Sequence, residues 1–416
     1  MKQLQYDIAV IGGGPAGLAA ALKAKSLGAG RVVILERDME LGGILQQCIH
    51  DGFGIHRFNE RLSGAQYAQR FIDELEGSGI DVKLDTTVLE LTEDKIIYAC
   101  NPAEGMLKLQ CGAVILAMGC RERTASQVLI YGSRPAGVLT AGAAQRYINM
   151  EGYLPGKKAV ILGSGDIGLI MARRMTLEGI EVEGVYEVMS APGGLTRNIV
   201  QCLDDYGIPL HLSHTVVKIR GNKRVESVTV CQVDEKREPV RGTEREIPCD
   251  LLVLAVGLIP ENELSREAGI QMDAKTKGPV VDNHFMTSCP GIFACGNVAV
   301  VFDLVDYVSQ SGEIAASGAV KYLRGELAAA PGYRETKAGA GMNFVVPQRL
   351  RSDCTEEEVT FFMRVKAPGK NVSLQCMVDG EMIKKERHNS VAPPEMLASK
   401  VRVAGAGIPE FRIVEG

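Results

Sequence analysis

The stretch from Tyr6 to Glu36 constrains the fold of this chain more than any other. It reads as an apolar strand, a glycine-rich turn spaced G-x-G-x-x-G, an alanine-rich helix and a second strand that ends in an acid. Gly12 allows a tight turn, Gly14 admits phosphates close to the backbone, and Gly17 lets the helix pack on the strand. Glu36 follows Gly12 by 24 residues, near the spacing of roughly 20 at which an acid reaches ribose hydroxyls. The stretch predicts a dinucleotide-binding turn, with the pyrophosphate at the helix N-terminus.

The same pattern returns later in the chain, after Lys158. Gly163, Gly165 and Gly168 repeat the three glycine positions, and Glu187 again follows the first glycine by 24 residues. A repeated unit of strand, glycine turn, helix, strand and acid predicts two nucleotide-binding domains rather than one.

The residues after Glu187 bear on which nucleotide the second turn prefers. They are Val188, Met189 and Ser190, with no arginine among them. A 2′-phosphate would meet a carboxylate without an adjacent countercharge, which favours NAD(H) over NADP(H).

A chain of 416 residues exceeds the roughly 250 to 300 residues at which one core stops growing, so several domains are expected. The predicted fold class is α/β, with two Rossmann-like three-layer domains and a small C-terminal β domain. The predicted domains are residues 1–121 with 276–330 for the first nucleotide, residues 122–275 for the second, and residues 332–416 for the β-rich segment. Helices are expected over 63–76, 169–177 and 309–323, a hairpin region over 88–109, and strands at 80–84, 112–119, 182–186, 250–257, 359–365 and 372–378.

Composition excludes several classes of protein. The chain is 46% hydrophobic and 23% charged, which excludes disorder, and it lacks the roughly 18 uninterrupted apolar residues of a membrane span. The first strand begins within a few residues of Met1, which leaves no room for a signal peptide and predicts a cytoplasmic protein. The net charge of −5 gives no attraction to nucleic acid or anionic membranes. The 11 cysteines form no C-x-x-C pair, so no metal site is predicted.

These residues together resemble the superfamily of flavoprotein oxidoreductases with two dinucleotide-binding domains, over about residues 6 to 325. The resemblance implies FAD at the first turn and a nicotinamide nucleotide at the second. The best-known branch reduces disulfides with a cysteine pair just after a double glycine. Here Gly42-Gly43 is followed by Cys48 alone, and disulfide exchange needs two positioned thiols. A disulfide reductase of the C-x₄-C type is therefore not expected.

A narrower resemblance rests on two segments, 119–124 (GCRERT) and 134–145 (RPAGVLTAGAAQ). They are similar to the FAD-binding subunits of opine oxidase, hydrogen cyanide synthase, dye-linked L-proline dehydrogenase and sarcosine oxidase. The resemblance implies one component of a heteromeric dehydrogenase or oxidase, acting on a small amino, imino or hydroxy acid or a glycerol-3-phosphate-like substrate. Such a component passes electrons between flavin and NAD(H) or a second flavoprotein subunit. The alternatives are a stand-alone NADH:acceptor reductase and a non-catalytic nucleotide-binding assembly subunit.

The cofactor residues follow from the two turns and from this resemblance. Those predicted to bind FAD are Gly12, Gly14, Pro15, Ala16, Gly17, Glu36, Arg37, Gly43, Ala117, Gly119, Gly296 and Asn297. Those predicted to bind NAD(H) are Gly163, Gly165, Asp166, Ile167, Gly168, Glu187 and Gly257. Asn297 stands where the superfamily usually has an aspartate, and its amide can still hydrogen-bond a ribityl hydroxyl.

The candidate catalytic residues are Gln47, Cys48 and His50, because this segment leaves the FAD-binding turn. Histidine suits proton transfer near neutral pH. The alternative is that Gln47 and His50 bond the backbone of a glycine-rich loop while Cys48 packs. Arg121 and Arg123 are predicted either to hold an anionic group or to form salt bridges between domains.

Overall fold

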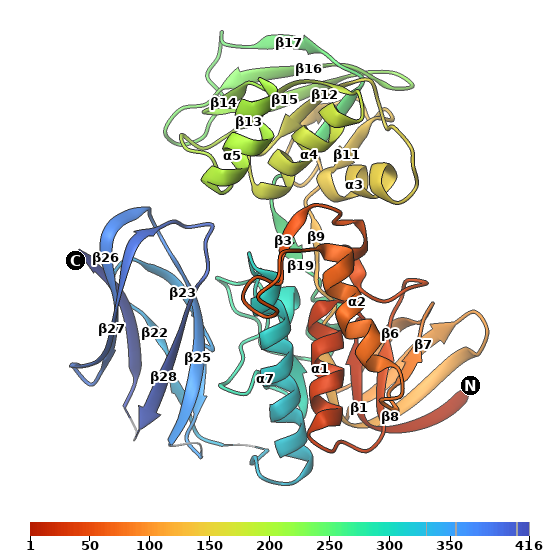
Figure 1. Cartoon of the computed structure of the whole chain (residues 1–416), viewed down its shortest axis with the longest axis vertical. Helices are drawn as coiled ribbons and strands as arrows, with labels where there is room; N and C mark the ends of the chain where they lie inside the picture. Colours follow the sequence, from red (N-terminus) through yellow and green to blue (C-terminus); the bar gives the residue numbers. More distant parts are fainter. Residues whose placement is uncertain (330, 354–355, 405–406, 416) are drawn as a thin grey trace. The chain divides into compact units, whose positions relative to one another are not determined.

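The computed structural model describes residues 1–329, 331–353, 356–404 and 407–415. Its contacts divide the chain into two compact units (Figure 1). Unit 1 comprises Met1–Gln46, Asp51–Cys120 and Pro260–Gly416, and unit 2 comprises Gln47–His50 and Arg121–Ile259. Both units are built on a mainly parallel sheet with helices. The predicted α/β class is confirmed.

Unit 1 centres on a seven-stranded sheet in the order β5-β2-β1-β8-β7-β6, with β20 also paired to β8. The strands are β1 (Lys2–Ile11), β2 (Val32–Leu35), β5 (Asp81–Lys83), β6 (Thr87–Leu91), β7 (Ile96–Asn101), β8 (Gly105–Leu116) and β20 (Ile292–Ala294). The predicted hairpin region and the predicted buried strand at 112–119 share β8, which is one continuous strand. This is because β1 pairs along nearly all of β8, while β7 and β20 pair with its first and last parts in turn.

Unit 1 also contains helices, several of which contact this sheet. The helices are α1 (Pro15–Ser26), α2 (Gly64–Leu75), α6 (Glu263–Glu267) and α7 (Val305–Leu323), with the 3₁₀ helices η1 (Gly43–Gln47) and η3 (Gly296–Val298). Two short strands, β3 (Asp51–Phe53) and β4 (Leu62–Ser63), also belong to this unit. α1 and α7 lie side by side (Figure 1). A Cβ at Gly312 would lie 2.2 Å from the carbonyl oxygen of Ala16, so small residues set the distance between these two helices.

Unit 2 is a three-layer unit around the parallel sheet β11-β18-β12-β13-β14. Ile161 and Val253 pack with the helices on one face, and their neighbours Val160 and Leu252 pack with the mixed sheet β10-β15-β16-β17 on the other. The strands are β10 (Tyr131–Gly132), β11 (Val138–Thr140), β12 (Lys158–Leu162), β13 (Glu181–Glu187), β14 (Leu210–Leu212), β15 (His214–Gly221), β16 (Val225–Gln232), β17 (Arg245–Pro248) and β18 (Leu251–Leu254). The helices are α3 (Ala141–Asn149), α4 (Asp166–Leu177), α5 (Thr196–Cys202) and the 3₁₀ helix η2 (Asp204–Tyr206). β9 (Cys120–Glu122) and β19 (Leu258–Pro260), where the chain passes between the units, pair with each other.

The C-terminal segment is β-rich, as predicted, and its sheets share one apolar core that includes Phe361 and Phe411. Its sheets are β22-β29-β26-β27, β23-β25-β28 and β21-β24. The strands are β21 (Tyr333–Glu335), β22 (Lys337–Ala338), β23 (Met342–Val346), β24 (Arg349–Arg351), β25 (Glu356–Val365), β26 (Gly369–Val378), β27 (Glu381–Val391), β28 (Leu397–Ala404) and β29 (Pro409–Glu415). The turn at Asp379 and Gly380 has φ of +50° and +90° and joins β26 to β27.

Contacts join this β-rich segment to the rest of unit 1. Phe362 packs edge-on against Phe302 at 5.0 Å between ring centroids. The guanidinium of Arg351, fully buried, lies 3.3 Å from the carboxylate of Asp282, also fully buried. The segment is therefore part of the same contact unit.

The contact units differ from the predicted domains beyond including the C-terminal segment in unit 1: Arg121 lies in unit 2, and two longer stretches change unit. Residues 260–275, which the sequence analysis assigns to the second domain, lie in unit 1, where the amide of Asn262 donates to the carbonyl oxygen of Val298. Residues 47–50, assigned to the first domain, lie in unit 2. Which nucleotide each unit binds stays a prediction. Among the described helices, none is long and apolar enough to cross a membrane.

Candidate functional site

The first glycine turn connects β1 to α1, and its three glycines differ in what surrounds the place of a Cβ. Gly12 has a φ of +107°, and a Cβ there would lie 2.4 Å from the carbonyl oxygen of Ala117. A Cβ at Gly17 would lie 1.9 Å from the carbonyl oxygen of Gly12, whereas a Cβ at Gly14 would meet no atom within 4 Å. The protein's own packing therefore requires Gly12 and Gly17. The space at Gly14 is open and is available to a ligand.

Glu36, at the end of β2, is held against this turn. Its carboxylate accepts the backbone N–H of Gly13 at 2.6 Å and that of Asp38 at 2.8 Å. The residue is only 7% exposed. Because each carboxylate oxygen can accept more than one hydrogen bond, Glu36 retains acceptor capacity for ribose hydroxyls.

The second turn repeats these contacts between β12 and α4. A Cβ at Gly163 would lie 2.2 Å from the carbonyl oxygen of Ala255, one at Gly168 would lie 2.4 Å from that of Gly163, and one at Gly165 would meet nothing. The carboxylate of Glu187 accepts the backbone N–H of Ser164 at 2.9 Å. It also accepts the N–H two residues further along, as Glu36 does. The repeat read from the sequence thus extends to individual hydrogen bonds.

The two turns differ in charge. α1 begins with Pro15 and carries no acid in its first turn, whereas α4 begins with Asp166. The Asp166 carboxylate accepts the N–H of Leu195 at 2.9 Å and the amide of Asn198 at 2.7 Å. A carboxylate at a helix N-terminus offsets the positive end of the helix dipole. The second turn therefore attracts an anion less strongly than the first.

Sequence reasoning missed one further element of the repeat. A Cβ at Gly43 would lie 3.2 Å from the Cα of Gly14, and one at Gly193 would lie 3.6 Å from the backbone nitrogen of Gly165. In both units, a glycine pair lies six and seven residues after the acid that ends the second strand. At this pair, the loop that follows the acid passes next to the middle glycine of the turn. The pair Gly193-Gly194 was the available signal.

The other residues predicted to bind FAD lie after the carboxyl ends of β1, β2, β8 and β20. Ala117 faces Gly12, as described, and Gly296 begins η3 where a Cβ would lie 2.8 Å from that of Ala16. The amide oxygen of Asn297 accepts the N–H of Phe302 at 3.0 Å. Gly119 has a φ of +73° and Arg37 is exposed. In unit 2, Ile167 lies in α4, and the carbonyl of Gly257 accepts the N–H of Arg123 at 3.0 Å.

The segment with the candidate catalytic residues is anchored to α3. The Gln47 amide donates to the carbonyl oxygen of Gly142 at 2.9 Å and to the side-chain oxygen of Gln145 at 3.0 Å. Asn149 donates to the carbonyl oxygen of Gln47 at 2.8 Å. The Glu122 carboxylate accepts the N–H of Gly142 at the start of α3. Sequence reasoning missed Glu122, Gln145 and Asn149, although Glu122 lies within the GCRERT segment.

Cys48 and His50 lie in different surroundings. Cys48 is buried, and loss of hydration raises the pKa of its thiol to about 12. The thiol is therefore protonated at neutral pH and is a poor nucleophile, since the thiolate is the reactive form. His50 is half-buried. The catalytic assignment of Gln47 and His50 stays a prediction, whereas the protonated thiol favours the alternative in which Cys48 packs. Among the described residues, no group of three or more His, Cys, Asp or Glu side chains could hold a metal ion.

Residues 6–315 match the sequence profile of the pyridine nucleotide-disulphide oxidoreductases. This match spans well over half of the chain and includes both glycine turns. The chain belongs to the pyridine nucleotide-disulphide oxidoreductase family. The predicted resemblance to this superfamily is confirmed.

Two curated relatives are named as components of larger enzymes. An opine oxidase subunit of Agrobacterium tumefaciens (strain Ach5) is 27% identical over 340 residues, which are 77% of this chain and 66% of that protein. The hydrogen cyanide synthase subunit HcnB of Pseudomonas aeruginosa is 26% identical over 63% of this chain and 59% of that protein. The chain thus matches somewhat less than two thirds of the length of these relatives.

A solved structure of the same architecture is the thioredoxin reductase of T. acidophilum. It has a TM-score of 0.62 and 23% identity, and the similarity covers 76% of this chain and 98% of that chain. At this identity the similarity supports the two-domain fold of a pyridine nucleotide-disulphide oxidoreductase.

Proposed function

We propose that this chain is an FAD-containing oxidoreductase subunit, with FAD at the first turn and NAD(H) at the second. Electrons then pass between the flavin and either NAD(H) or a partner flavoprotein. The observation that carries this proposal is the duplicated turn, in which Gly14 and Gly165 leave open space while Glu36 and Glu187 fold back on the turn. Two such turns in one chain suit two different nucleotides.

The charge difference between the turns supports FAD at the first. A tightly held cofactor benefits from the full positive end of a helix dipole, which α1 offers because its first turn carries no acid. Asp166 weakens this attraction at α4, and weaker binding suits a nucleotide that must exchange in each cycle. When bound, the flavin supplies the hydride and electron chemistry, while the protein supplies binding and orientation.

The second turn favours NAD(H) over NADP(H). Glu187 lies at the end of β13 and is followed by Val188, Met189 and Ser190. A 2′-phosphate beside that carboxylate would be repelled, whereas ribose hydroxyls can donate to it.

The names of the relatives support a role within a heteromeric enzyme. The opine oxidase and hydrogen cyanide synthase relatives are both named as subunits, which implies a partner, and we propose that the partner is a second flavoprotein. The substrate class proposed is a small amino, imino or hydroxy acid, or a glycerol-3-phosphate-like compound. Disulfide reduction is not proposed, because Cys48 is buried and the sequence has Gly43 and Phe53, not cysteines, at C-x₄-C spacing from it. Gln47 and His50 are the residues proposed to orient substrate or move a proton.

Anaerobic mixing with NADH tests the redox role of the second turn. The purified FAD-loaded chain should lose its yellow flavin absorption within minutes, and NADPH should reduce it at least tenfold more slowly. Gly165→Ala should abolish reduction by NADH while dithionite still bleaches the flavin, because this Cβ intrudes on the pyrophosphate and not on the fold. A chain that retains FAD yet is not bleached by NADH would refute NADH as its reductant.

The second candidate is an assembly subunit whose second site holds a nucleotide that takes no part in redox chemistry. The carboxylate of Asp166 at the N-terminus of α4 favours it, since it weakens the attraction for a pyrophosphate. Activity that appears only with a partner protein, and never with the isolated chain and a dye, would favour this candidate. Turnover of NADH with a quinone or dye in the isolated chain would instead favour a stand-alone reductase.

A further inference from the structure

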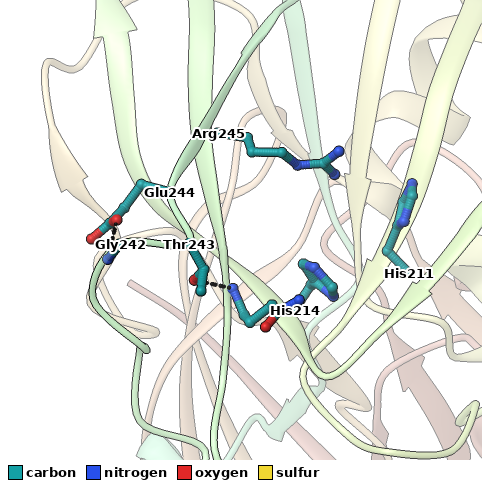
Figure 2. Close-up of a pocket in the computed structure, with 7 residues that line it drawn as sticks. His211, His214, Gly242, Thr243, Glu244 and Arg245 are labelled. Atoms are coloured by element: carbon teal, nitrogen blue, oxygen red, sulfur yellow. Dashed lines mark hydrogen bonds between the residues drawn. The ribbon is translucent and has the colours of Figure 1, made fainter.

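Unit 2 contains a cavity of about 500 Å³ that the proposed function does not use. Its lining comes from the end of β14, the start of β15, the end of β16 and the turn that leads into β17 (Figure 2). The lining residues are His211, His214, Gln232, Gly242, Thr243, Glu244 and Arg245. None of them belongs to either glycine turn or to the segment 47–50.

Two imidazole rings form one side of the cavity. The ring of His211 stacks on that of Tyr186, with centroids 4.7 Å apart and planes inclined by 21°. Gly184, which has no side chain, leaves space for the His211 ring: a Cβ at position 184 would lie 3.4 Å from the His211 Nε2. The ring of His214 lies 5.8 Å from that of His211. Packing thus fixes both rings near each other.

The tautomer of His214 follows from its contact with Leu212. Its Nδ1 lies 2.7 Å from the carbonyl oxygen of Leu212. A carbonyl oxygen can only accept, so Nδ1 carries the proton. Nε2 is then the atom left for a ligand, and it becomes a donor when the ring is protonated.

Arg245 supplies a permanent positive charge. Its guanidinium extends from the start of β17 toward His211 (Figure 2), and it forms no ion pair within the described part of the chain. Glu244 is turned to the N–H of Gly242, at 2.7 Å. Glu183 in β13, whose negative charge raises the pKa of His211, forms an ion pair with Lys158 at 2.8 Å. The positive charge in the cavity is therefore not neutralised by its neighbours.

The charges around His211 make its protonation depend on a ligand. Burial lowers the pKa of His211, and the positive charges of Arg245 and of protonated His214 lower it further, whereas Glu183 raises it. A bound anion would reverse this effect, since an opposite charge nearby favours the charged form. Tyr186, the remaining titratable neighbour, has its own pKa raised by burial and is neutral near pH 7.

We propose that this cavity binds the phosphate group of a small ligand, through Arg245, His211 and His214. Donors that converge from three strands suit the several oxygens of a tetrahedral anion, whereas the guanidinium alone could satisfy a planar carboxylate. The Thr243 hydroxyl already accepts a hydrogen bond from the N–H of Gln232 and donates its proton to the carbonyl oxygen of Val240. Thr243 therefore forms part of the cavity wall and is not counted among the donors to the ligand. The volume falls within the roughly 300 to 1,000 Å³ of small-molecule sites, so a phosphate monoester fits as well as inorganic phosphate.

Calorimetric titration of the full FAD-loaded chain tests this site. The probes are inorganic phosphate, phenyl phosphate and benzoate, without added nucleotide. Arg245→Gln and His211→Gln should each weaken phosphate binding about tenfold, in line with the loss of one charge-assisted hydrogen bond. Arg237→Gln is the matched control, because Arg237 is exposed on the same hairpin and does not line the cavity. Either phosphate probe binding in this way supports the site, and the tighter one identifies the ligand class.

Sulfate isolates the contribution of the imidazoles, because its charge does not change between pH 5 and 8. Its affinity should fall severalfold as the pH rises over this range and His211 loses its proton. Equal affinities in Arg245→Gln and Arg237→Gln, tighter binding of benzoate than of either phosphate, or competition by NADH would each overturn the proposal. Flavin reduction by NADH should be unchanged in Arg245→Gln, so failure of this site is distinguishable from failure of the proposed function.

Discussion

The contrast between Gly14 and Gly17 gives the sharpest test of the first turn. Both belong to the same G-x-G-x-x-G pattern, yet they predict opposite consequences of one added methyl group. Gly14 has a φ of −76° and open space where a Cβ would go. Gly14→Ala should therefore leave the free energy of unfolding of the apoprotein within about 0.5 kcal/mol of the original, the range of substitutions that disturb no contact.

Gly17→Ala should behave differently. Its Cβ would lie 1.9 Å from the carbonyl oxygen of Gly12, against a normal carbon–oxygen contact of about 3.3 Å, so helix and turn must separate by about 1.4 Å. Alanine gains about 1 kcal/mol of helix propensity over glycine. Overpacking against rigid backbone costs about 1 to 3 kcal/mol or more. We expect a net loss of about 2 kcal/mol.

The assay separates stability from cofactor binding. Each variant is stripped of FAD and unfolded with urea, because bound ligand would otherwise add its own stabilisation. FAD is then added back, and the retained flavin is measured after gel filtration. We expect Gly14→Ala to fold normally and to retain less than a tenth of the FAD, and Gly17→Ala to be destabilised. Normal FAD retention by Gly14→Ala would refute the assignment of its open space to the pyrophosphate.

Three further predictions concern the buried groups of Cys48 and Arg351. Cys48→Ser should change the rate of flavin reduction by less than about twofold, because its thiol is protonated at neutral pH; a large loss of rate with normal FAD content would contradict this. Burial of the neutral Cys48 thiol contributes to the free energy of unfolding in full below the usual thiol pKa of about 9, and this contribution is lost as the pH rises toward 12. In urea unfolding between pH 8 and 11, the free energy of unfolding should therefore fall more steeply for the unmodified chain than for Cys48→Ala. Arg351→Ala should cost about 3 to 5 kcal/mol by leaving the carboxylate of Asp282 buried and unpaired. Asp282→Asn combined with Arg351→Met should recover much of that loss in thermal unfolding, and no recovery would argue against an unpaired charge as the cause.

Much of the fold was predictable from short stretches of sequence. The turns at Gly12 and Gly163 and the helix α4 follow from steric rules that act within a few residues. The β-rich character of the C-terminal segment followed from alternating patterns and from the turn at Asp379-Gly380. The continuous strand β8 was not predictable, because its length depends on pairing with β1, β7 and β20 together.

The sequence by itself determined the two nucleotide turns, their acids and the α/β class, because each rests on local backbone geometry and on hydrophobic periodicity. Only the tertiary structure decided that Gln47 is held by α3 and that 260–275 lie with unit 1. It alone brought His211 to Arg245, which lie 34 residues apart in the chain. Such contacts depend on how strands are ordered in a sheet and which faces pack, and no local pattern encodes that order.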